Sequence, residues 1–346
     1  MSNSPLPHVA EKARSVAAFI RPLALPGLLA LLLVAAALGL RWGAVDLSTV
    51  SWIDFITLRA KDSTQGAILY DVRLPRVLLA IAAGFGLAAS GTTWQALLRN
   101  PLADPYLIGV SAGGALGAGV AIIFGAHLPF GANAVPLFAF VGSLAAVGLV
   151  YALAGQGAAS IERVLLVGVA MGAFLTACLS MLTFWHADSI STLYFWMLGG
   201  FSGRGWEELT QMLPYLVAGL ALIALQLRHL NVMQLGPDRA RSLGVDVVRC
   251  QRLLLAGASL TTAAVVSASG MIGFVGLVVP HLARLLVGPD LRRALPVACL
   301  MGAILLVCSD LVARTAWAPT EVPVGVLTAM LGAPFFLYLI VKERRA

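Results

Sequence analysis

Long runs of apolar residues, separated by short polar stretches, recur along the whole sequence. Each run is about as long as the roughly 20 residues that an α-helix needs to cross a bilayer. Inside lipid every backbone N–H and C=O must be bonded within the protein, so only helices or closed β-barrels can span it. The runs are continuous and lack the alternation of barrel strands, and they therefore predict transmembrane helices.

Ten such spans are predicted, and the chain is expected to be an all-α integral membrane protein. The spans cover residues 23–41, 75–98, 105–124, 134–154, 163–184, 207–227, 250–269, 272–287, 295–312 and 323–341. The first run is longer than the core of a signal peptide and ends at Arg41, which indicates a retained helix. No polar stretch is large enough for a second domain, so residues 1–346 are expected to form one transmembrane domain with an N-terminal tail at 1–22.

The composition fits this interpretation. Hydrophobic residues make up 60% of the chain and charged residues 11%, against about 25% charged in soluble domains. The net charge is +7, but the basic residues stand at the ends of apolar runs, so nucleic-acid binding is not expected. The cysteines lie in or beside apolar runs and are interpreted as small buried hydrophobes: Cys178, Cys250, Cys299 and Cys308.

The positions of Lys and Arg predict the orientation. With ten spans and a cytoplasmic N-terminus, 16 of the 23 basic residues fall on the cytoplasmic side and 7 on the outer side. The positive-inside rule favours this topology, in which both termini are cytoplasmic.

The two halves of the chain have weakly similar patterns. Each half has a long helix, then a stretch interrupted by Gly or Pro, then a short helix; the interruptions lie at residues 100–111 and 270–281. The second of them contains Pro280 and His281. Paired interruptions of this kind are typical of inverted repeats around a central pathway.

Glycines four residues apart mark two predicted helices. Gly109, Gly113 and Gly117 share one face, and Gly168 and Gly172 share another. Glycine lets helices approach closely in lipid, so these faces are expected either to pack inside the subunit or to face a pathway or a dimer partner.

Other polar residues leave alternatives open. The stretch 235–249 is polar, with a helix start at Pro237-Asp238 and a stop at Gly244, and it is either a solvated loop or a docking element. Asp310 and Arg314 lie four residues apart near the end of a span, and the pair is either a functional site or a structural salt bridge. The isolated His127, His186 and His281 are expected to be surface or interface residues, although a haem ligand is conceivable for the first two.

Catalytic motifs are missing from the sequence. It has no G-x-x-x-x-G-K-[ST], H-E-x-x-H or G-x-S-x-G, so neither ATP binding through a P-loop nor an enzyme active site is predicted. No metal ligands or bound cofactors are expected in this chain.

Four stretches resemble the signature of the FecCD-type permeases, the membrane subunits of type II ABC importers for siderophores, haem and vitamin B12. They are residues 73–118, FWMLGGFSGRGW (195–206), SGMIGFVGLVVPHLARLLVGPDLRR (269–293) and residues 310–340. With 235–249 they cover most of residues 70–341 in the family's order.

The resemblance implies a homodimer in the bacterial cytoplasmic membrane, two ATPase subunits that use ATP and Mg²⁺, and a periplasmic or lipoprotein binding protein. It implies the following roles for residues of this sequence. The translocation pathway would include Gly168, Met171, Gly172 and Leu175; binding-protein docking would use Arg73, Arg76 and Arg314; ATPase coupling would use Leu235, Gly236, Asp238, Arg241 and Gly244; and the family's structural motifs would include Asn100, Pro101, Asp104, Pro280, His281 and Asp310.

Rival functions remain. An ion-driven secondary transporter also uses inverted repeats and broken helices, but it would be expected to carry acidic or polar residues deep in its spans. A membrane-embedded enzyme or receptor has no motif to support it. An iron chelate, as ferric siderophore or haem, is the expected substrate, with vitamin B12 as the alternative.

Overall fold

The computed structural model describes residues 7–43, 45, 63–125, 131–155 and 161–343. Its longer helices are α1 (Pro7–Arg41), α4 (Leu74–Leu98), α5 (Val110–Phe124), α6 (Ala134–Ala154), α7 (Ile161–Trp185), α9 (Trp206–Met233), α11 (Val247–Ser269), α12 (Val275–Val287), α13 (Leu291–Thr315) and α14 (Val324–Glu343). The shorter elements are α3 (Thr64–Ala67), η1 (Ile68–Arg73), η2 (Pro105–Ile108), η4 (Gly131–Asn133), η5 (Ala187–Ser189), α8 (Ile190–Met197) and α10 (Pro237–Ser242). The described ranges contain no strand.

The predicted number of about ten spans is confirmed. In the described ranges seven helices are long and apolar enough to cross a membrane, and three shorter apolar helices, in α5, α12 and α14, bring the number to ten. Helix α1 starts at Pro7, inside the predicted N-terminal tail, and its apolar span covers Leu23–Arg41, the range predicted for the first span. The helix α8 was not predicted, because its eight residues are too few to cross a bilayer.

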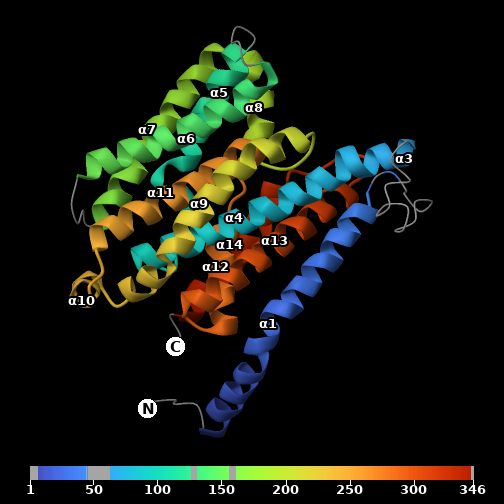
Figure 1. Ribbon diagram of the computed structural model, residues 1–346. Helices are drawn as coiled ribbons and strands as arrows, with labels where there is room; N and C mark the ends of the chain where they lie inside the picture. Colours follow the sequence, from blue (N-terminus) through green and yellow to red (C-terminus); the bar gives the residue numbers. More distant parts are fainter. Residues whose placement is uncertain (1–6, 44, 46–62, 126–130, 156–160, 344–346) are drawn as a thin grey trace.

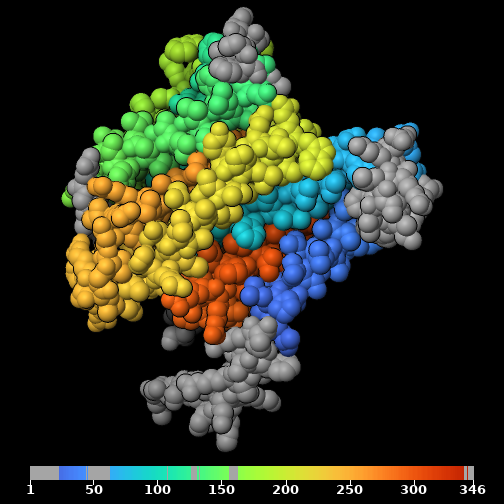
Figure 2. All heavy atoms as spheres, in the orientation of Figure 1, coloured from blue at the N-terminus to red at the C-terminus, as the bar shows by residue number. Residues whose placement is uncertain are grey.

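The helices form one bundle in which α4, α9 and α11 lie between two outer groups (Figure 1). On one side α5 packs on α6 and α7; on the other, α13 packs on α1, α4 and α12. The first helix runs along the edge of the bundle, as the blue band in Figure 2 shows. Both α4 and α11 are largely buried, as expected for helices surrounded by others.

Glycines allow the closest of these contacts. A Cβ added at Gly113 would lie 2.3 Å from the carbonyl oxygen of Gly142, and one added at Gly84 would lie 2.2 Å from that of Gly302. A side chain at these positions would push α5 off α6, or α4 off α13. The predicted packing role is therefore confirmed for Gly113, whereas Gly109 precedes α5 in a left-handed conformation with φ +84°.

The two predicted interruptions meet in space. The first contains η2 and Gly109, and the second runs from Gly270 to Phe274 before α12. The hydroxyl of Tyr106 donates to the carbonyl of Ile272 at 3.0 Å and accepts from its N–H at 3.1 Å. The backbone N–H and C=O of Ile272, which no helix pairs, are thus hydrogen-bonded inside the protein. Non-helical backbone within a membrane requires such internal partners.

Candidate functional site

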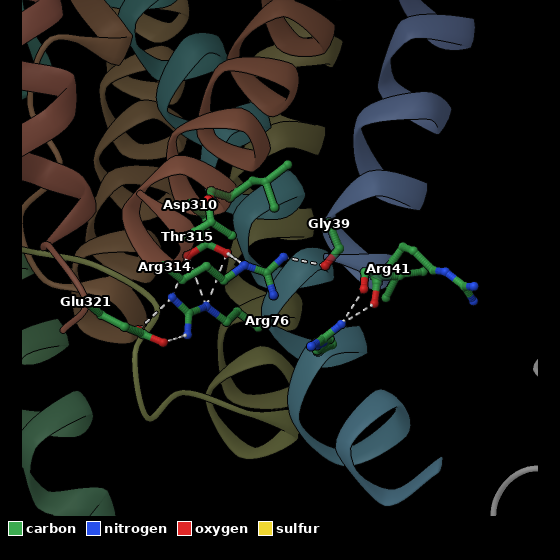
Figure 3. A network of polar contacts seen from close by, with 10 residues as sticks. Gly39, Arg41, Arg76, Asp310, Arg314, Thr315 and Glu321 are labelled. Carbon is green, nitrogen blue, oxygen red and sulfur yellow. Dashed lines mark hydrogen bonds and ion pairs between the residues drawn. The ribbon is translucent and has the colours of Figure 1, made fainter. Parts of the chain in front are cut away.

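Four charged side chains form a buried cluster where α4, α13 and the loop before α14 meet. Arg76 places Nε 3.0 Å and Nη2 2.9 Å from Oδ1 of Asp310. Its two Nη atoms also donate to the carboxylate of Glu321 at 3.1 and 3.0 Å. Arg314 lies 3.5 Å from Asp310 through Nε. We call Arg76, Asp310, Arg314 and Glu321 the Arg76–Asp310 network (Figure 3).

Two arginines bind the C-terminal end of α1. Arg314 donates to the carbonyl of Gly39, and Arg73 donates to the carbonyls of Leu40 and Arg41 at 3.0 and 2.7 Å (Figure 3). The last carbonyls of a helix have no hydrogen-bond partner within the helix and form the negative end of its dipole. A guanidinium at this end donates hydrogen bonds to these carbonyls and neutralises the negative charge of the dipole. These contacts attach α1 to η1 and α13 although the residues are far apart in sequence.

The network balances two positive against two negative charges, and it is largely removed from water. Only Glu321 is appreciably exposed, at 33% of its side chain. Desolvation acts to raise the pKa of Glu321, but the hydrogen bonds and charge of Arg76, together with a hydrogen bond from Ser202 and the charge of Arg314, outweigh it and bring the pKa below its ordinary value of 4.5. Arg76 and Glu321 also line a cavity of about 500 Å³ together with Arg204, Trp196 and the 321–324 loop.

The arginines assigned to binding-protein docking are buried in the subunit. Arg73, Arg76 and Arg314 are 4%, 7% and 5% exposed, and all three donate to groups of their own chain. The alternative of a structural salt bridge between Asp310 and Arg314 describes the structure better. Docking through these guanidinium groups would require their internal bonds to open, so that role stays a prediction.

The predicted coupling stretch folds as its turn residues indicated. Helix α10 starts after Gly236 at φ +106°, and Gly244 follows it at φ +82°, both in backbone regions that favour glycine. Arg241 pairs with Asp238 at 2.8 Å on the surface, with side chains 47% and 91% exposed. Ala240 is fully buried and fixes the helix to the bundle.

Two leucines flank α10 on the surface. Leu235 is 55% and Leu243 is 64% exposed, in a segment whose other exposed residues are polar or glycine. Exposed apolar side chains rimmed by polar ones are typical of a contact with another protein. The segment therefore has the composition of a docking surface.

The predicted pathway face of α7 is turned mostly inward. Gly168 is buried, Leu175 is 9% exposed, and a Cβ on Gly109 would lie 3.9 Å from the carbonyl of Gly168 and 4.0 Å from Met171. Gly172 differs, because nothing lies within 4 Å of its Cβ position. The family resemblance assigned these residues to the pathway, and that role stays a prediction.

The opposite face of α7 is the exposed one. It carries small side chains between larger apolar ones, and its exposed residues include Val169, Ala170, Ala173, Phe174, Thr176, Ala177 and Ser180. The hydroxyl of Thr176 donates to the carbonyl of Gly172 at 2.8 Å, so this hydroxyl is hydrogen-bonded within its own helix. This face is mostly apolar, and in the part of the chain that the structure describes it is left exposed.

The motif residues of the first interruption shape a turn. The side chain of Asn100 accepts from the N–H of Leu102 at 2.9 Å, beside an exposed Pro101. Asp104 caps η2 by accepting from the N–H of Tyr106 at 2.8 Å.

The histidines and cysteines show no shared site. Pro280 is buried inside α12 and His281 is partly buried beside it, while the ring of His186 lies edge-on to Phe124 with centroids 5.3 Å apart. His127 lies outside the described residues. Among the described side chains, no group of three or more His, Cys, Asp or Glu could hold a metal ion.

Comparison with known proteins decides the family. The model of the FecCD transport family matches residues 18–342. The chain belongs to the FecCD family. It is thus the permease subunit of a type II ABC importer, and the resemblance found in the motifs is confirmed.

Two curated FecCD relatives are similar over most of their length. The hemin transport system permease HmuU of Yersinia pestis is 41% identical over 341 residues, which cover 94% of this chain and 97% of HmuU. The cobalamin import system permease BtuC of Halobacterium salinarum is 43% identical over 303 residues, which cover 87% of this chain and 80% of that protein.

A solved structure is also similar. It is an inward-facing conformation of a metal-chelate type ABC transporter, with a TM-score of 0.82 and 32% identity over 93% of this chain and 99% of that one. The predicted type II importer fold is confirmed by this similarity together with the helix pattern.

Two residues of this FecCD permease were missed by sequence reasoning. Glu321 completes the Arg76–Asp310 network and Tyr106 joins the two interruptions. Glu321 could have been suspected, because it is an acid inside the 310–340 motif of a chain with few charges. Tyr106 offered no signal, since its partner is a backbone group 166 residues away.

Proposed function

We propose that this FecCD permease imports an iron chelate, as ferric siderophore or haem, by ATP-driven alternating access. Family membership over residues 18–342 is the observation that carries the proposal. The nearly full-length similarity to a hemin permease and to a metal-chelate transporter supports this substrate class. Cobalamin is the second candidate, favoured by the relative named for cobalamin import.

The proposed assembly contains two copies of this chain, two ATPase subunits and a periplasmic or lipoprotein binding protein in the bacterial cytoplasmic membrane. Both termini would be cytoplasmic, as the 16-to-7 distribution of basic residues indicates. The sequence has no phosphate-binding loop, so ATP and Mg²⁺ would be used by the ATPase subunits. A permease of this kind responds to ATP only if its partner binds two of its conformations with different affinity.

The segment 235–249 would bind the ATPase. Its exposed Leu235 and Leu243 offer apolar contact, and the surface pair of Asp238 and Arg241 offers charge. Buried Ala240 would pass a displacement of α10 to the helices beneath it, because it packs in their core.

The pathway would follow α7, but along its exposed face. Ala173, Thr176 and Ala177 leave room and present little polarity to a large chelate. Gly172 lies at the border of this face and has open space around it. Two copies facing one another through α7 would enclose a smooth, weakly binding channel.

Reconstitution tests the substrate and the energy source. The permease, its ATPase and its binding protein would be placed in proteoliposomes and offered a ferric siderophore, haem and cobalamin separately, with ATP inside. We expect uptake of an iron chelate that requires ATP hydrolysis and is absent with a hydrolysis-deficient ATPase. ATP-dependent uptake of cobalamin alone would support the second candidate, and uptake driven by an ion gradient without ATP would contradict the proposal.

Two bulky substitutions test the pathway in the same proteoliposomes. We expect Ala173→Trp and Gly172→Leu to reduce uptake strongly while the complex still assembles, because each adds volume at the channel surface. Ala145→Trp, on an exposed position of α6, adds volume outside the proposed channel and should leave uptake intact. Equal uptake by all three variants would show that the pathway does not follow this face of α7.

A further inference from the structure

A second cavity opens between α6, α9 and α11. Its volume is about 360 Å³, within the roughly 300–1,000 Å³ range of small-molecule sites. Its walls are almost wholly apolar and include Leu144 and Val147 of α6, Leu222 of α9, and Leu255 of α11. The three helices appear as neighbouring green, orange and yellow bands on the face shown in Figure 2.

We call this cavity the α6–α9–α11 groove, and beside it α6 and α9 contact one another through an aromatic pair. Phe140 of α6 and Tyr215 of α9 contact one another with ring centroids 4.5 Å apart. Two helical turns further along α6, Gly148 has no atom within 4 Å of its Cβ position. The missing side chain leaves open space between helices that are long and apolar enough to stand in a bilayer.

Two polar side chains stand at one end of the groove. Arg252, in the second turn of α11, is exposed and donates through Nε to the hydroxyl of Tyr151 in the last turn of α6, at 3.3 Å. Among the described residues no ion pair includes Arg252. Its two Nη groups are therefore available, and a guanidinium binds phosphate well through such a pair of donors.

A third polar group lies deeper. Ser259 lines the groove, and its hydroxyl is buried and has no hydrogen-bond partner among the described residues. Ser259 follows Arg252 by seven residues, which corresponds to about 10 Å along a helix. A buried hydroxyl without a partner costs free energy, so a ligand oxygen at this depth would be favourable.

We infer that the α6–α9–α11 groove binds one anionic phospholipid. The phosphate would bind Arg252 and Tyr151, an acyl chain would lie along the apolar walls, and Ser259 would donate to an oxygen below the headgroup. The order of charge, hydroxyl and apolar surface along the groove matches the order of groups along a phospholipid.

Membrane physics favours a lipid over other occupants. Tyr and Arg near helix ends are typical of the headgroup region, and basic pockets between transmembrane helices bind anionic headgroups. The same end of the bundle carries further arginines near helix ends, among them Arg163 and Arg228, which raise the local positive potential. This inference does not depend on the transported substrate.

Native mass spectrometry of the purified full-length chain tests the inference. The protein would be equilibrated with vesicles of equal parts phosphatidylglycerol and phosphatidylcholine, and the retained lipid would be counted per chain. We expect one tightly held phosphatidylglycerol. Its retention should fall about fivefold in Arg252→Ala, which corresponds to about 1 kcal/mol per basic residue at the membrane surface. It should also fall in Gly148→Phe, because the ring would fill the groove without changing the charge.

Matched variants separate the site from general effects. Arg249→Ala removes a positive charge one turn earlier on α11, and Gly27→Phe adds a ring at an exposed position of α1. Both should retain the lipid. Equal retention of the two lipids, or equal retention by Arg252→Ala and Arg249→Ala, would overturn the inference. Loss in Arg252→Ala with full retention in Gly148→Phe would also overturn it, because a phosphate would then bind without its chain in the groove.

Discussion

Two pairs of opposite charges in this permease have the same chemistry and different surroundings. In the Arg76–Asp310 network, arginine and aspartate lie 2.9 Å apart with side chains 8% and 2% exposed. In α10, Arg241 and Asp238 lie 2.8 Å apart with side chains 47% and 91% exposed. The distances are nearly equal, so burial is what distinguishes the two sites.

Burial changes what each pair can do. A buried charge is costly unless it is paired, so the network fixes α1, α4 and α13 against one another and resists rearrangement. An exposed pair contributes little to stability and is free to exchange its partner for one on another protein. The same residue types therefore hold the fold in one place and remain available for binding in the other.

The largest expected effect follows from removing the shared acid of the network. Asp310→Ala would leave Arg76 and Arg314 buried without their common partner, at a cost of about 3–5 kcal/mol. The measurement is thermal unfolding of the purified protein in detergent, followed by scanning fluorimetry. We expect a large fall in Tm or loss of folded protein.

The matched control is Asp238→Ala in α10, which breaks an ion pair of the same length on the surface. It should leave Tm almost unchanged. If both variants unfolded at the same temperature, burial would not be the property that separates the two sites.

A smaller effect is expected at the exposed edge of the network. Glu321→Gln keeps the shape and removes the charge that Arg76 binds, and because a third of Glu321 is exposed we expect a loss of about 1 kcal/mol. The variant should also fold with Asp310 still paired. Unfolding by denaturant at pH 7 would measure the difference.

The pH dependence of the Glu321 contribution has a definite sign. Its pKa is below 4.5 in the folded protein, so the stabilisation is fully present above that ordinary value and is lost as pH falls through the lowered folded value. The difference between the wild type and Glu321→Gln should therefore shrink below about pH 4.5. A difference that grew on acidification would contradict the ion pair.

The smallest effect on stability is expected in α10. Arg241→Ala should change the free energy of unfolding by no more than about 0.5 kcal/mol, because an exposed pair at i,i+3 is weak. Substrate-stimulated ATP hydrolysis in the assembled complex should nevertheless fall. Arg239→Ala on the same short helix is the comparison, since its side chain is exposed and lies outside the Asp238–Arg241 pair. Unchanged coupling in Arg241→Ala would remove this pair from the proposed ATPase contact.

Sequence reasoning succeeded where the cause was local. The apolar runs predicted the spans, and α6 begins and ends where its run does, because crossing a bilayer requires a minimum length of apolar helix. Glycine and Pro237 predicted the start and end of α10, because φ preferences act within a few residues.

It failed where the partner was distant in sequence. The sequence did not reveal that the arginines assigned to docking are buried: Arg76 pairs with Asp310 across 234 residues and Arg314 with Gly39 across 275. The spacing of Gly168 and Gly172 identified a face of α7 correctly as one surface, yet could not tell whether it pointed into the subunit or away from it. Periodicity defines a face and leaves its direction open.

The sequence alone determined the class of this protein, its number of spans, the two interruptions and its family, because hydropathy, turn residues and family motifs are all written in consecutive positions. Only the tertiary structure decided which charges are structural and which are exposed, which face of α7 is open, and where a groove remains between α6, α9 and α11. The physical reason is that burial depends on which elements pack around a residue, and a helix packs against elements that are distant in sequence and cannot be identified from the order of residues.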